Sequence, residues 1–152
     1  MKKGLRTMWI PLVAATFAWS ACSDDDPVGG GDVPPPDLSG TYTLVTFSSP
    51  LTGGVPLGPA QGVTGTFTLD QTNVDGDEAT GTLSVTINVP DGMGGTNQIV
   101  DQGTFTIRSD GSWEQSGQLN QATGTYDLQG NVLTVVVTQP AAAVSTSVWQ
   151  RQ

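Results

Sequence analysis

Gly40-Thr41-Tyr42-Thr43-Leu44 is a stretch that this chain repeats with small changes, and the repetition decides its fold class. Clear copies are Gly65-Thr66-Phe67-Thr68-Leu69, Gly103-Thr104-Phe105-Thr106-Ile107 and Gly124-Thr125-Tyr126-Asp127-Leu128, and a weaker copy is Gly81-Thr82-Leu83-Ser84-Val85. Each copy alternates small polar side chains with large apolar ones, which is the pattern of a β-strand with one solvated face and one buried face. The repeats therefore predict an antiparallel meander.

Alternation and turn signals around these repeats predict about eight strands. We expect them at 40–47, 63–71, 79–89, 97–108, 112–118, 122–128, 131–138 and 143–151. Short connections such as Asp75-Gly76-Asp77 and Asp110-Gly111 are typical of hairpins, whereas Ser48 to Gly62 is a longer loop rich in proline and glycine. A long first loop followed by tight hairpins favours an all-β fold, a single antiparallel up-and-down barrel whose mouth that loop covers. An immunoglobulin-like β-sandwich remains the alternative.

The first residues of the chain have the pattern of an export signal. Lys2, Lys3 and Arg6 precede an apolar stretch from Met8 to Trp19, which is shorter than the roughly 20 residues needed to span a bilayer. We therefore interpret residues 1–21 as a cleaved signal peptide.

The end of this signal, Ser20-Ala21-Cys22, resembles the lipobox of bacterial lipoproteins, in which the cysteine receives a diacylglycerol before cleavage ahead of it. Cys22 is the single cysteine of the chain, so it has no partner for an internal disulfide. The resemblance implies that acylated Cys22 anchors the protein in a lipid bilayer. Ser23 after it favours the outer membrane, with the domain facing the periplasm or the cell surface. An ordinary secretory signal is the alternative.

Composition divides the remainder into a linker and one domain. Residues 22–37 contain Asp24-Asp25-Asp26, Gly29-Gly30-Gly31 and Pro34-Pro35-Pro36, which predicts a disordered linker. Residues 38–152 are enough for one domain with one core. All fourteen acidic residues follow the signal, and Arg108 and Arg151 are the basic residues that remain beside them. Nucleic-acid binding needs a cationic surface, so the charge excludes it.

Three stretches of the domain resemble the lipocalin-like, calycin-type lipoproteins of bacteria. They are Leu38-Ser39-Gly40-Thr41-Tyr42-Thr43-Leu44-Val45, the segment from Gly124 to Val135, and Val148-Trp149-Gln150-Arg151. In lipocalins the first strand carries Gly-x-Trp, and an arginine of the last strand packs over that indole and closes one end of the barrel. Here tyrosine replaces tryptophan, so the resemblance implies contact between Tyr42 and Arg151. A frayed C-terminus is the alternative.

Apolar residues at alternate strand positions are expected to line the barrel interior. Such residues either fill the barrel as a core or leave room for one small apolar ligand, and the sequence leaves both readings open. We interpret Trp113 and Trp149 as packing residues rather than a binding platform. The candidate ligand-lining residues are Phe67, Leu69, Leu83, Val85, Ile87, Phe105, Ile107, Tyr126, Leu128, Leu133, Val135 and Val137.

Catalytic and metal sites are not expected. The chain has no histidine, and its glutamates, Glu78 and Glu114, are interpreted as solvated charges at strand ends rather than a glycosidase pair. The segment from Asn73 to Glu78 resembles part of a calcium loop but lacks the remaining ligands, so we interpret it as a polar hairpin turn. We therefore expect no catalytic residue, no metal and no cofactor.

Together these features predict a membrane-anchored, lipocalin-like lipoprotein of the bacterial envelope that is not an enzyme and binds or carries a small apolar ligand. The alternative is a structural or interaction module that contacts an envelope protein or a glycan through its loops.

Overall fold

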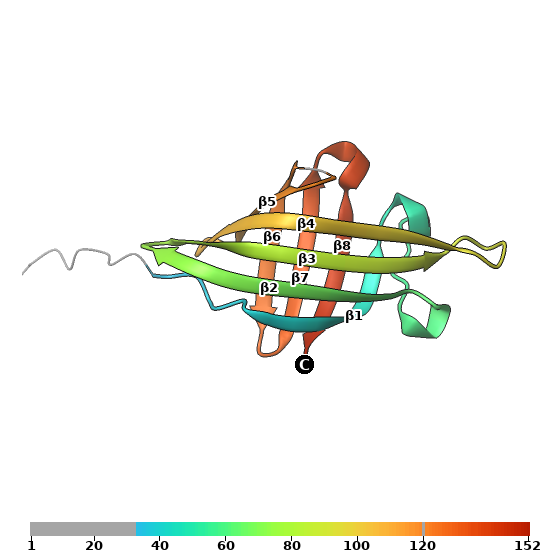
Figure 1. Ribbon diagram of the computed structural model, residues 1–152, viewed down its shortest axis with the longest axis horizontal. Helices are drawn as coiled ribbons and strands as arrows, with labels where there is room; N and C mark the ends of the chain where they lie inside the picture. The colour runs from blue at the N-terminus through green and yellow to red at the C-terminus, as the bar shows by residue number, and fades with distance from the viewer. Residues whose placement is uncertain (1–32, 120) are drawn as a thin grey trace, which may run out of the picture. The chain divides into compact units, whose positions relative to one another are not determined.

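A computed structural model describes residues 33–119 and 121–152 of the 152-residue chain. In this part the strands are β1 (Gly40–Ser48), β2 (Thr64–Asp75), β3 (Glu78–Pro90), β4 (Thr96–Arg108), β5 (Ser112–Gly117), β6 (Gln121–Gln129), β7 (Val132–Gln139) and β8 (Ser145–Arg151). They follow one another around a closed antiparallel barrel in chain order. Figure 1 shows β2, β3 and β4 crossing steeply over β6, β7 and β8.

The pairing of β1 with β8 closes the barrel, from Tyr42 opposite Arg151 to Ser48 opposite Thr146. The predicted up-and-down barrel is therefore confirmed, and the sandwich alternative is wrong. Three short 3-10 turns complete the described secondary structure: η1 (Pro50–Thr52), η2 (Pro59–Gln61) and η3 (Ala141–Ala143). No helix in the described residues is long and apolar enough to cross a membrane.

Two irregularities adjust the strands. Register shifts between Leu44 and Thr46 on β1, so Tyr42, Leu44 and Phe47 are buried although strict alternation would turn Phe47 outward. An extra residue of this kind is a β-bulge, which bends the strand without losing the pairing. A second shift, after Gln71, lets β2 run on beyond its predicted end to a tight turn at Gly76 and Asp77.

The two ends of the barrel differ. We call the closed end the one where β1 starts and β8 stops, and the open end the one that carries η1, η3 and the β3–β4 hairpin tip (Figure 1). The closed end is packed with fully buried side chains. They include Leu38, Tyr42, Leu69, Ala79, Ile107, Trp113 and Leu133.

The N-terminal predictions fall largely outside the described residues. The signal peptide at 1–21, Cys22 and the linker as far as residue 32 all lie there. Of the rest of the predicted linker, Pro35 is buried and the Asp37 carbonyl accepts a hydrogen bond from Arg151, so the packed part of the chain starts before residue 38.

Candidate functional site

A cavity of about 400 Å³ occupies the interior toward the open end of the barrel. This volume lies within the range of small-molecule sites in proteins. Much of its wall consists of apolar side chains from β1, β2, β3, β4, β7 and β8. Five of the predicted interior residues line it: Phe67, Val85, Ile87, Val135 and Val137.

The other seven predicted residues do not line this cavity. Five of them are buried in the core, namely Leu69, Leu83, Phe105, Ile107 and Leu133. Tyr126 is buried as well and donates its hydroxyl proton to the Arg108 carbonyl, 2.9 Å away. Leu128 is partly buried against the same core. Position along the strand explains the division, because the interior is filled near the closed end and hollow farther along.

The mouth of the cavity is built from loops. Ser49, Pro50 and Leu51 of the first loop line it, as do residues of the β7–β8 connection around η3 and Leu119 of the β5–β6 connection. The Ser49 hydroxyl accepts a hydrogen bond from the Leu51 amide at 3.2 Å, and the Ser49 amide donates to Thr52 Oγ1 at 3.0 Å. This reciprocal cap holds the short turn against the end of β1.

Aromatic rings form the base of the cavity. Phe67 lies 5.1 Å from Trp149 and 6.1 Å from Trp113 between ring centroids, and Phe105 stacks on Trp113 at 5.4 Å. Trp149 lines the cavity, whereas Trp113 is buried outside it. The Nε1 of Trp149 is buried with no acceptor among the described residues, so it is shielded from the cavity rather than offered to a ligand.

Asp101 and Gln115 line the cavity and were not predicted from the sequence. Asp101 is 5% exposed. Its Oδ1 accepts from the amides of Gln102 and Leu119 at 2.9 and 3.2 Å, and its Oδ2 accepts from Gln115 Nε2 at 3.2 Å. The sequence did indicate their orientation. Asp101 lies an even number of residues from Phe105 and Ile107, and Gln115 lies two residues from Trp113, so strand alternation places them on the same inner face.

Tyr42 and Arg151, expected to meet, are paired directly at the closed end. The Tyr42 hydroxyl donates to the Leu38 carbonyl at 2.8 Å and accepts from Arg151 Nε and Nη2 at 3.0 and 2.6 Å. The guanidinium carbon lies 5.2 Å from the centroid of the ring. Burial raises the pKa of the Tyr42 hydroxyl, and the hydrogen bond from Arg151 opposes that rise.

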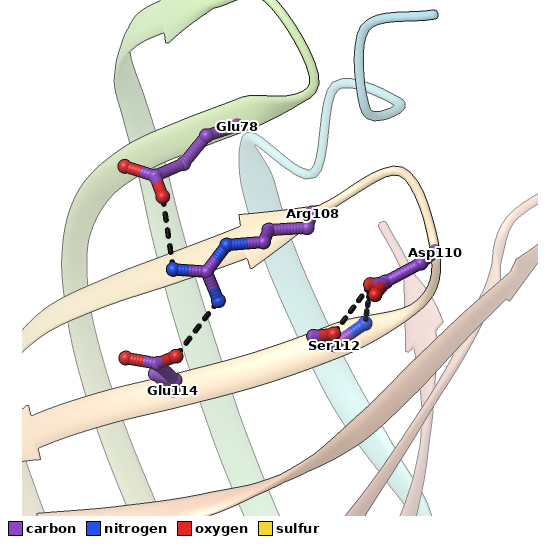
Figure 2. Close-up of polar contacts among 5 residues, drawn as sticks. All are labelled: Glu78, Arg108, Asp110, Ser112 and Glu114. Atoms are coloured by element: carbon purple, nitrogen blue, oxygen red, sulfur yellow. Dashed lines mark hydrogen bonds and ion pairs between the residues drawn. The ribbon is translucent and has the colours of Figure 1, made fainter.

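The glutamates lie on the outer wall near the closed end, where Arg108 binds both (Figure 2). Its Nη2 is 3.0 Å from Glu78 and its Nη1 is 2.7 Å from Glu114, which joins three adjacent strands. In the following turn Asp110 accepts hydrogen bonds from the amide and hydroxyl of Ser112 (Figure 2), and these bonds lower the pKa of its carboxyl group.

The aspartate-rich β2–β3 turn is the segment that resembles part of a calcium loop. Glu78 of this segment forms an ion pair with Arg108, and the backbones of Asp75 and Glu78 face each other in the register of the hairpin. Within residues 33–119 and 121–152 no group of three or more acidic, histidine or cysteine side chains is arranged to hold a metal ion.

Comparison with known proteins adds no assignment, because no family model, no curated protein and no solved structure matches this chain.

Proposed function

We propose that this protein is a lipocalin-like binding protein of the bacterial envelope, which holds a small, largely apolar molecule in the open end of its barrel. The cavity of about 400 Å³ carries this proposal. A barrel that served only as a scaffold would gain stability by filling that space, because unfilled apolar volume weakens packing. The role is binding without catalysis.

The proposal is tested by blocking the cavity. Val137→Trp, on the inner face of β7, would place an indole in the cavity, whereas Val136→Trp puts the same group on the outer face of the same strand. We expect the uncharged fluorescent probe N-phenyl-1-naphthylamine to bind the parent chain and Val136→Trp, and to lose most of its affinity for Val137→Trp. If the parent chain leaves the probe unbound, or if Val137→Trp binds it as well as the control, the binding proposal is wrong.

Anchoring through Cys22 is the second part of the proposal, and it rests on the lipobox resemblance. Acylated Cys22 would hold the barrel at the outer membrane, facing the periplasm or the cell surface. Cys22→Ser is expected to move the protein from the detergent-extracted membrane fraction to the soluble fraction. A serine variant that stays with the membrane would contradict lipidation.

A second candidate function is attachment to an envelope protein or a glycan. Its support is the apolar rim of the cavity mouth, where Leu51 is 58% exposed, Leu119 60% and Val144 43%. Exposed apolar groups that gather in one place are typical of interaction sites. Val137→Trp fills the cavity and leaves these rim side chains in place, so it is expected to abolish probe binding while such a partner stays bound, which separates the two candidates.

A further inference from the structure

The wall of the cavity carries one buried carboxylate, Asp101, without a cation beside it. In the described residues the cations are Arg108 and Arg151, and both are engaged toward the closed end, with Glu78 and Glu114 and with Tyr42 respectively. Arg108 lies seven residues farther along β4, roughly 23 Å from Asp101 at the usual rise of a strand. Neither arginine reaches the carboxylate.

The surroundings of Asp101 leave part of it unused. A carboxylate offers about four lone-pair sites, and three donors reach this one. Two of them bond Oδ1, and the third, Gln115 Nε2, bonds Oδ2. One acceptor site on Oδ2 therefore remains on a side chain that lines the cavity.

The neighbouring strand β5 leaves space for the Asp101 carboxylate. Gly117 of β5 lies beside Asp101, and a Cβ atom at position 117 would overlap the carboxylate. The amide of Leu119, just beyond β5, then donates to Oδ1. A glycine, a loop amide and the side chain of Gln115 thus hold the carboxylate at a fixed place in the cavity wall.

We propose that the ligand is a cationic amphiphile, with an ammonium group that binds Asp101 and an apolar body that fills the cavity toward Phe67 and Trp149. This inference rests on the proposed binding function and specifies its ligand class. A hydrogen bond between ionised partners is about twice as strong as a neutral one, so an ammonium exploits the free Oδ2 site better than a hydroxyl does.

The net charge of the domain also favours a cationic ligand. Residues 33–152 carry ten acidic side chains and two basic ones, so the field of the barrel attracts cations and repels anions. A fatty-acid carboxylate in this cavity would face Asp101 with no arginine or lysine to neutralise either charge, which is costly in an apolar setting. The cavity therefore selects against anionic lipids.

The experiment compares three probes with the same apolar chain: octylammonium, octan-1-ol and octanoate. Each displaces N-phenyl-1-naphthylamine from the full chain carrying Cys22→Ser, at neutral pH, where an alkylamine is protonated. We expect octylammonium to bind about tenfold or more tightly than octanol, and octanoate to bind weakest. In Asp101→Asn the advantage of octylammonium over octanol is lost while octanol still binds. Asp70→Asn, which removes a carboxylate from the outer face of β2, serves as the control and keeps the advantage.

Three results overturn the inference. One is equal binding of octylammonium and octanol to the parent chain, which needs no variant and stands even if Asp101→Asn does not fold. Another is an equal loss of all three probes in a folded Asp101→Asn, which would make the carboxylate only a tie between β4 and the loop after β5. The third is an unchanged preference in Asp101→Asn. Failure of the parent chain to bind N-phenyl-1-naphthylamine contradicts the proposed function itself.

Discussion

At the closed end, the hydroxyl of Tyr42 joins two parts of the chain that are far apart in the sequence. It accepts two hydrogen bonds from the guanidinium of Arg151 and donates one to the carbonyl of Leu38. Arg151 Nη2 also donates to the Asp37 carbonyl at 2.8 Å, and the arginine stem covers Gly40. A phenol therefore performs at this end a task that an indole cannot, since indole has no acceptor oxygen.

Tyr42→Phe is expected to lower the free energy of unfolding by about 1.5–3 kcal/mol, because it removes a charge-assisted pair of hydrogen bonds and leaves the Leu38 carbonyl unpaired. Tyr126→Phe is the matched control. It removes one neutral hydrogen bond, to the Arg108 carbonyl, and should cost about 1 kcal/mol. Urea unfolding measures both. Equal costs for the two substitutions would show that the hydrogen bonds from Arg151 to the Tyr42 hydroxyl add nothing to the closure.

Both tyrosines of the chain also predict how stability depends on pH. Burial raises the pKa of the Tyr42 and Tyr126 hydroxyls in the folded state. In the unfolded chain a tyrosine ionises near pH 10, so above that pH the unfolded state loses protons that the folded state keeps. The free energy of unfolding should therefore not change through these groups below about pH 10 and should fall as the pH rises further. Urea unfolding in alkaline buffers measures this dependence, and Tyr42→Phe should make the decline of the free energy of unfolding with pH less steep. If that free energy does not decline up to about pH 11, the prediction is wrong.

At the scale of the strand, the glycine of the repeated motif has a structural purpose that alternation alone did not reveal. A Cβ atom at Gly65, Gly81, Gly103 or Gly124 would press on a backbone carbonyl oxygen of the neighbouring strand. Each of these glycines faces the barrel interior, as does the aromatic or aliphatic residue two positions later. Missing side chains at such positions let strands approach closely and bend, as closure of a small barrel requires.

Gly124→Ala tests this reading. The added methyl group would meet the Val136 carbonyl, which belongs to the backbone of β7 and cannot turn aside, so we expect a loss of about 1–3 kcal/mol in the free energy of unfolding. Gly95→Ala is the control, because there the methyl group meets the side chain of Asp91 and not a backbone. Asp91 Oδ1 accepts from the Met93 and Gly95 amides in a surface turn, so the loss should stay below about 1 kcal/mol. If Gly124→Ala is as stable as the control, then β6 and β7 shift apart enough to accommodate the methyl group, and the close approach is not required.

The sequence was sufficient for the strands but not for their irregularities. Alternation located every strand to within a few residues, because a half-buried strand must show its period in the sequence. The bulge on β1 was missed, since Val45 and Thr46 fit a continuing strand equally well and only the pairing with β8 selects the inserted residue. Asp101 was missed for another reason: apolar side chains are the usual sign of an interior position, and a buried carboxylate departs from that rule.

At the scale of the whole molecule, alternation says which side chains point inward but not whether they fill the space between them. Leu133, Val135 and Val137 lie on one face of β7 and carry the same pattern, yet Leu133 packs into the core and the two valines line the cavity. The difference depends on the side chains that face them across the barrel, such as the aromatic cluster around Phe67. Which side chains face each other is decided only when the barrel closes. The cavity therefore had to come from the structure.

Closure also predicts that the chain can be cut and rejoined elsewhere. The first and last strands of the barrel lie together, because Tyr42 pairs with Arg151 and the Gln152 amide donates to the Thr41 carbonyl at 2.9 Å. A short flexible linker from Gln152 to the residues before Leu38, with new termini at the β3–β4 tip beside the 95% exposed Met93, should preserve all eight strand pairings.

We expect the permuted domain to keep its near-UV circular dichroism and a cooperative melt. Opening the chain instead at Leu83, in the buried middle of β3, should abolish both. A tip-opened permutant that fails to fold, beside an unpermuted 33–152 chain that folds, would mean that the seam between β1 and β8 is not formed as described.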